Sequence, residues 1–169
     1  MDRAELRAAQ APLKERYRTE PEAALVTLRA SGELDADAIA CSVATGRALV
    51  EAGLHPATGG TGTLACSGDM LLEALVACAG VTLRSVATSL EIPVTGTVRA
   101  EGDLDFRGTL GIDKTGAAPV GFRETRLRFE LDTDDDDRLA DLIRLTERYC
   151  VVLQTLTGGV PVAVEITGG

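Results

Sequence analysis

The chain is poor in aromatic residues and has no tryptophan: Phe, Trp and Tyr together make up 3% of its 169 residues. Because 45% of the residues are nevertheless hydrophobic, the core must be aliphatic and rich in alanine. Histidine is almost missing as well, since His55 is the only one and Pro56 follows it. We therefore do not expect a hydrolase that uses a serine, histidine and aspartate triad.

Positive charge is in deficit. The formal net charge is −9, which argues against nucleic acid and anionic membranes as partners. The first residues, Met-Asp-Arg-Ala-Glu, are charged and unlike a secretory leader. With four cysteines, this predicts a cytoplasmic protein with free thiols. Glu73 and Arg84 interrupt the apolar run around residues 70–81, so we interpret this run as a fully buried core helix too short to span a bilayer.

Hydrophobic periodicity predicts one α+β domain over residues 1–169, without internal repeats or linkers. Residues 53–68 are rich in Gly, Pro and Thr and predict a loop. Pro12 is expected to kink or split the first helix. Helices are expected at residues 3–17, 67–90 and 134–149, and strands at 25–30, 39–43, 48–51, 94–107, 127–131 and 161–166. In the last helix we expect Leu139, Leu142, Ile143 and Tyr149 to be buried.

Two cysteines far apart in sequence have similar settings. Cys78 lies inside the apolar helix and Cys150 ends the charged amphipathic one, so the two helices would form a buried dithiol if they packed together. Cys78 as a small core residue is the alternative. A reactive Cys78 would need a cationic partner, because the middle of a helix gives a thiolate little help. Cys150, at a helix end, suits a resolving thiol. Cys41 is interpreted as a core residue and Cys66 as a more exposed loop residue.

Other chemistries find little support, and we expect no cofactor and no metal. The cysteine spacings and the distant His55 do not match a zinc pattern. The glycine-rich residues 59–62 lack the lysine of a phosphate loop and the spacing of a dinucleotide fingerprint, so they predict a turn or the wall of a pocket. The aspartates at 134–137 sit at a helix start, where carboxylates complement the helix dipole.

Two blocks of sequence resemble the OsmC/Ohr family of thiol peroxidases. The first runs from the glycines at 59–62 through Ser67-Gly68-Asp69 into the apolar helix with Cys78, and the second is residues 146–150, which end in Cys150. The similarity covers roughly residues 22–167, so residues 1–20 are expected to be an N-terminal helical extension. The resemblance implies an intertwined homodimer in which antiparallel sheets wrap central helices and the active sites lie at the subunit interface.

The resemblance also implies an enzyme. Cys78 would attack the O–O bond of an organic hydroperoxide and become a sulfenic acid, and Cys150 would condense with it to a disulfide. A dithiol of the lipoyl type would then reduce the disulfide. Asp69 stands near the place of the family's glutamate, which helps hold an arginine against the thiolate. Arg47 is the first choice for that arginine; Arg84 and Arg148 are alternatives.

Two other functions stay open on the same fold. One is a binding or redox-sensing module whose dithiol oxidises without turnover, and the other is a purely structural dimer whose cysteines only pack. Multiple turnover with a dithiol reductant would distinguish the enzyme from both.

Overall fold

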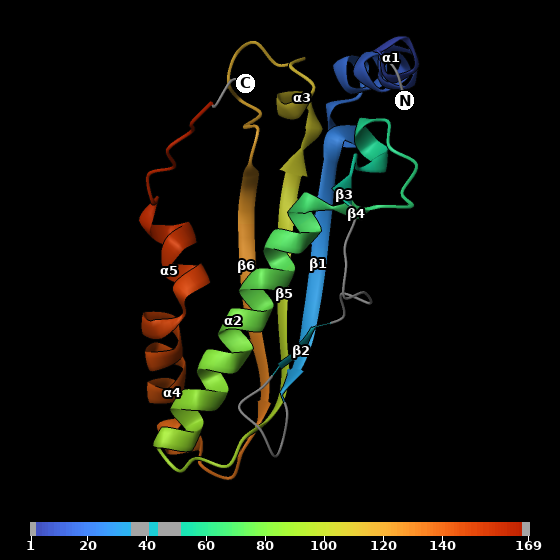
Figure 1. The fold of residues 1–169 in the computed structure, drawn as a ribbon. Coiled ribbons are helices and arrows are strands. Elements are labelled where there is room, and N and C mark those ends of the chain that lie inside the picture. The colour runs from blue at the N-terminus through green and yellow to red at the C-terminus, as the bar shows by residue number, and fades with distance from the viewer. Residues whose placement is uncertain (1–2, 35–40, 44–51, 167–169) are drawn as a thin grey trace.

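The computed structural model describes residues 3–34, 41–43 and 52–166 of the chain, with side chains for residues 8–26 and 52–166 (Figure 1). Arg47 and residues 48–51 therefore lie outside the described residues. In chain order the elements are α1 (Arg3–Thr19), η1 (Pro21–Ala24), β1 (Leu25–Leu34), β2 (Cys41–Val43), β3 (Ala52–Gly53), η2 (Pro56–Thr58), β4 (Ala65–Cys66), α2 (Ser67–Ser89), β5 (Thr95–Asp105), α3 (Phe106–Thr109), β6 (Phe122–Asp132), α4 (Asp136–Tyr149) and α5 (Val151–Gly158).

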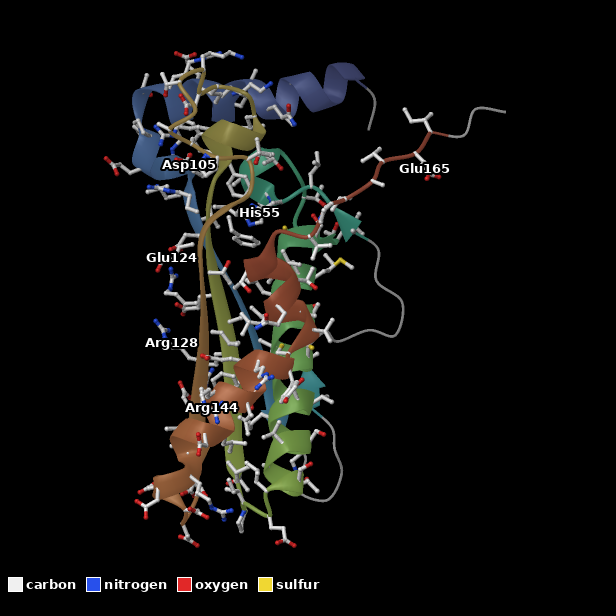
Figure 2. All side chains as sticks on the ribbon, turned by 90° about the vertical axis from the view of Figure 1, so that its left-hand side faces the viewer. His55, Asp105, Glu124, Arg128, Arg144 and Glu165 are labelled. Atoms are coloured by element: carbon white, nitrogen blue, oxygen red, sulfur yellow. The ribbon has the colours of Figure 1, made fainter. Side chains whose placement is uncertain are left out.

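An antiparallel sheet with strand order β2-β1-β5-β6 forms one layer. The strand predicted at 94–107 is confirmed over Thr95–Asp105, where Val98 and Ala100 are fully buried on one face, whereas residues 106 and 107 belong to α3. The other face carries charges in ion pairs, such as Arg126 with Asp103 at 2.6 Å. Figure 2 shows Arg128 on this face, pointing away from the helices. The sheet therefore has one apolar face, and the helices cover it.

Helix α2 crosses the apolar face of the sheet, and α4 and α5 lie beside it (Figure 1). Its inward side chains contribute more buried hydrophobic residues than any other element of the described chain: Leu72, Leu75, Val76, Ala79, Leu83 and Ala87. The prediction of a fully buried helix is wrong for the single chain, since Leu71 and Val81 are 38% and 39% exposed. The prediction that this helix is too short to span a bilayer is also wrong: at 23 residues, α2 is long and apolar enough by composition to cross a membrane, a test that core helices pass too. Its inner face, however, packs on the sheet.

Several predicted elements need correction. Pro12 lies within one uninterrupted helix, and the expected loop at 53–68 contains two short parallel strands and η2. The strand predicted at 161–166 does not form in the single chain: these residues belong to no described sheet and are exposed, and the unpredicted helix α5 precedes them. Tyr149 is 56% exposed, although its helical spacing predicted burial. Leu142 is fully buried, as predicted.

Tyr17 is the buried contact of the N-terminal helix with the rest of the described chain. Tyr17 is 2% exposed, and its hydroxyl donates a hydrogen bond to the carbonyl of Ala57 in η2 at 2.8 Å. His55 immediately precedes η2, and its Nδ1 accepts a hydrogen bond from the N–H of Ala57. The His55 ring also stacks on the ring of Phe106, with the ring centroids 4.9 Å apart. Helix α1 is thereby joined to the segment that leads into α2.

Candidate active site

The structure brings Cys78 and Cys150 together. Cys78 lies midway along α2 and is partly buried, whereas Cys150 is fully buried between α4 and α5. Both are free thiols, and they lie close enough that each affects the pKa of the other. Residues 72 positions apart in sequence thus form a dithiol, which the packing of α2 against α4 and α5 creates.

The backbone turns at Cys150. Its φ of −72° and ψ of 105° are extended, so α4 ends there and α5 begins with Val151. The Cys150 N–H still bonds to the carbonyl of Thr146 at 2.9 Å, and the Cys150 carbonyl accepts the first bond of α5, from Gln154 N–H. The Gln154 side chain also donates to the carbonyl of Glu147, the group that Val151 N–H would bond if α4 continued. Because of this turn, the first backbone N–H groups of α5 do not bond to carbonyls of α4.

The first amides of α5 lower the pKa of Cys78. Burial raises the pKa of the Cys78 thiol, but hydrogen bonds from Val152 N–H, the Cys150 thiol, the Thr82 hydroxyl and Val151 N–H lower it, and the net pKa lies below the ordinary value. Amides at a helix start stabilise anions because they are unpaired donors at the positive end of the helix dipole. In the described part of the chain, the strongest influences on the thiolate are uncharged groups, whereas the sequence predicted a cation.

Cys150 has the opposite character. Burial, above all, raises its pKa to about 11; the amides of Leu153 and Val152 oppose this rise, and the neighbouring Cys78 adds to it. At neutral pH Cys150 is therefore a thiol that donates a hydrogen bond, and Cys78 is the acceptor. Cys78 is thus the more readily ionised and more nucleophilic thiol of the pair, and Cys150 stays protonated beside it.

The other predicted site residues that the structure describes do not gather around Cys78. Asp69 is in the first turn of α2, nine residues before Cys78 and so about 14 Å away along the helix axis. Burial raises the pKa of Asp69, and the field of His55 opposes this. Arg84 donates to the carbonyl of Val94 at 3.2 Å, and Arg148 lies over the ring of Tyr149 at 5.3 Å. Arg47 lies outside the described residues.

Two grooves flank the dithiol. The first, about 510 Å³, lies between α2, α5 and β6 and is lined by Leu71, Leu72, Leu75, Gly121, Phe122, Thr125, Leu127, Leu153, Leu156 and Thr157. The second, about 590 Å³, lies between α2 and α4 and is lined by Val81, Thr82, Ser85, Val86, Ser89, Leu90, Leu145 and Tyr149. Leu75 precedes Cys78 by one turn and Thr82 follows it by one turn. Both grooves therefore begin within one helical turn of the dithiol, and both have mostly apolar walls.

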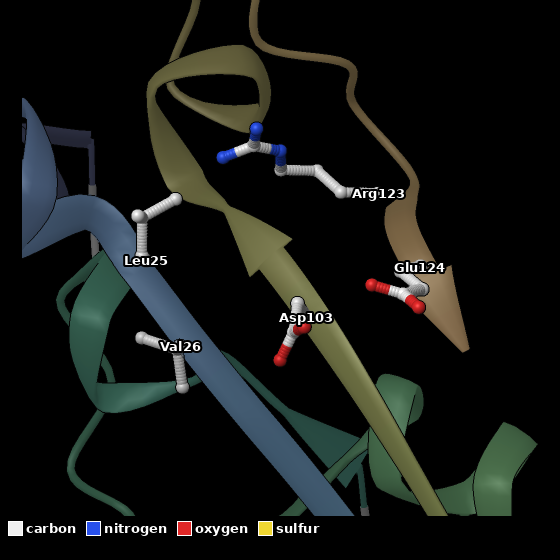
Figure 3. Close-up of a pocket in the computed structure, with 5 residues that line it drawn as sticks. All are labelled: Leu25, Val26, Asp103, Arg123 and Glu124. Atoms are coloured by element: carbon white, nitrogen blue, oxygen red, sulfur yellow. The ribbon is translucent and has the colours of Figure 1, made fainter. Parts of the chain in front are cut away.

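Two further cavities lie away from the dithiol. One, of about 390 Å³, is lined by His55, Phe106 and Cys66, among others. Cys66 precedes α2, and it is twelve residues from Cys78, or about 18 Å along the axis. Figure 3 shows the other, of about 450 Å³, where Leu25 and Val26 of β1 face Asp103 of β5 and Arg123 and Glu124 of β6. This cavity has no thiol and no histidine.

The sequence did not point to Thr82 or to the amides of Val151 and Val152 as part of the site. The spacing of Cys78 and Thr82, four residues apart in a helix, was a usable signal. No side-chain pattern can indicate a backbone amide; the turn at Cys150 had to be known. Among the described residues, no group of three or more His, Cys, Asp or Glu side chains is arranged to hold a metal ion.

Comparison with known proteins gives one family. The family model described as OsmC-like protein matches residues 60–165, which contain α2, both cysteines of the dithiol and every later element. No curated protein matches the chain.

Proposed function

Because the chain belongs to the OsmC-like family, we propose that it is a thiol-dependent peroxidase that reduces organic hydroperoxides. The observation that carries the proposal is the meeting of Cys78 and Cys150, whose pKa values are displaced in opposite directions. A thiolate is the nucleophilic form of cysteine, and a neighbouring protonated thiol is suited to resolve the sulfenic acid that it forms. The family supports a general role in peroxide or osmotic stress; the specific mechanism is our proposal.

In the first step the Cys78 thiolate attacks the terminal oxygen of the hydroperoxide. An S–O bond forms, the O–O bond breaks, and the departing alkoxide takes a proton to become an alcohol. Cys78 is then a sulfenic acid. The amides of Val151 and Val152 help this step because they hold the sulfur as a thiolate before the attack.

In the second step Cys150 attacks the sulfur of the sulfenic acid. A disulfide forms, the S–O bond breaks, and hydroxide leaves as water with the proton from the Cys150 thiol. An external dithiol, of the lipoyl type in our proposal, then reduces the disulfide by two thiol exchanges and is itself oxidised to a cyclic disulfide. One hydroperoxide and one dithiol are thus converted into an alcohol, water and a disulfide.

The apolar grooves support an organic rather than an inorganic hydroperoxide. The groove between α2, α5 and β6 is lined mainly by leucines and phenylalanine, and these would bury an alkyl or aryl group beside Cys78. Hydrogen peroxide has no such group. We therefore expect cumene hydroperoxide to be consumed faster than hydrogen peroxide.

We further propose that the enzyme is an intertwined homodimer in a reducing cytoplasm. The support for the homodimer is apolar surface that a single chain leaves exposed. Val81 on α2 is part of this surface, and in the C-terminal segment Val162, Val164 and Ile166 are 84%, 85% and 93% exposed. Alternating apolar residues in an extended segment are typical of a strand that lacks its neighbour. Figure 2 shows this segment, with Glu165, leading away from the body of the chain.

The proposal is tested by turnover of the reduced protein with cumene hydroperoxide and dihydrolipoamide. The unaltered protein should turn over many times, Cys78→Ser should consume no hydroperoxide, and Cys150→Ser should stop at a Cys78 sulfenic acid that dimedone traps. Hydroperoxide consumption by Cys78→Ser would overturn the assignment of the nucleophile. A single oxidation without turnover would instead support a redox sensor.

A further inference from the structure

Cys78 has a hydroxyl neighbour on its own helix. Thr82 follows Cys78 by four residues in α2, so the two side chains lie on the same face, one turn apart. The Thr82 side chain is one of the groups that lower the pKa of the Cys78 thiol. Thr82 is partly buried and also lines the groove between α2 and α4.

Other helical threonines of the chain behave differently. A threonine hydroxyl in a helix commonly bonds to the carbonyl four residues back. Thr88 does so with Arg84 at 2.8 Å, and Thr146 does so with Leu142 at 2.8 Å. The hydrogen bond of Thr82 to a sulfur is therefore a feature of this position and not a general property of the helix.

We propose that Thr82 is a positioning residue that, together with the first amides of α5, holds the Cys78 thiolate by hydrogen bonding. The sulfur then has donors on two sides: α5 supplies Val151 and Val152 N–H, and α2 supplies Thr82. Donors from two elements fix the direction of the thiolate as well as its charge. The inference rests on the proposed peroxidase only for its effect on turnover, because the ionisation of Cys78 can be measured without any peroxide.

The test is the pH dependence of Cys78 alkylation by iodoacetamide, read by peptide mass so that the other cysteines do not interfere. Thr82→Val keeps the shape of the side chain and removes the hydroxyl, whereas Thr82→Ser keeps the hydroxyl. In Thr82→Val we expect the alkylation midpoint to move to higher pH, with about tenfold less thiolate below the midpoint, the effect of losing one hydrogen bond to a charged group. Thr82→Ser should keep the midpoint of the unaltered protein.

A matched control separates this effect from a general change in the helix. Thr88→Val makes the same substitution in α2 at an exposed position whose hydroxyl bonds to a carbonyl, so the Cys78 midpoint should stay unchanged. An unchanged midpoint in Thr82→Val, or an equal rise in Thr82→Ser, would overturn the inference. A normal Thr82 effect in a protein that does not turn over hydroperoxide would instead contradict only the proposed function.

Discussion

Replacing Val151 with proline should lower the reactivity of Cys78 without loss of stability. Val151 is the first residue of α5, a position where proline is favoured because the missing N–H has no partner in the helix. The preceding residue, Cys150, already has the extended backbone that proline requires of its neighbour. Val151 is 70% exposed, so its side chain contributes little packing. The substitution therefore removes one donor to the Cys78 sulfur and changes little else.

The magnitude follows from the donor that is lost. A hydrogen bond to a charged group contributes about 1.5–3 kcal/mol, and because Val151 acts on Cys78 less strongly than Val152, Cys150 and Thr82, we take about 1 kcal/mol. That value corresponds to about fivefold less thiolate at a pH below the pKa. The remaining thiolate is more basic and so more nucleophilic, which leaves a fall in alkylation rate of about two- to threefold at fixed pH. Proline in a compatible position should meanwhile add about 0.4–1 kcal/mol of stability.

The assay is peptide-resolved alkylation of Cys78 as a function of pH, together with thermal unfolding. Val151→Ala is the control, because it keeps the N–H and shortens the same exposed side chain. An alkylation midpoint equal to that of Val151→Ala would refute the role of the α5 amides. A large drop in unfolding temperature would refute the backbone geometry assigned to the turn at Cys150.

Two further predictions concern stability. Tyr17→Phe removes the hydrogen bond to Ala57 and should cost about 1 kcal/mol, or about 2–4 °C in unfolding temperature; an unchanged temperature would mean that this bond does not hold α1. Asp105 has a fully buried side chain, and its hydrogen bonds from Arg107 lower its pKa although burial opposes them. Its contribution is therefore present above the ordinary carboxyl pKa and is lost as pH falls through the lowered value. Asp105→Asn should cost about 2 kcal/mol at pH 7 in urea unfolding, and a deficit that persists undiminished at pH 2 would contradict this origin.

The sequence predicted the helices and strands whose own residues show a periodic apolar pattern. The alternation along residues 95–105 indicates a half-buried strand because every second side chain meets the same helical layer. The apolar run around Cys78 likewise indicates a core helix. Tyr149 was expected to be buried with Leu142, but it is the last residue of α4 and its side chain is exposed.

The remaining features depend on contacts between distant segments. Helix α5 was missed because Val151 and Val152 are β-branched and disfavour a helix, and no charged residue marks its first turn. The segment at 161–166 alternates like a strand but pairs with no strand of the same chain in the described region. The charge of Cys78 was expected to require an arginine, because backbone amides leave no trace in a sequence.

The central claim is that Cys78 and Cys150 form a redox couple. The most direct measurement is treatment of the reduced protein with one equivalent of cumene hydroperoxide, followed by intact mass and peptide mapping. The account predicts a mass loss of two hydrogen atoms, with a disulfide between the peptides that contain Cys78 and Cys150. A Cys78 that stays a free thiol, or that pairs with Cys66 instead, would contradict it.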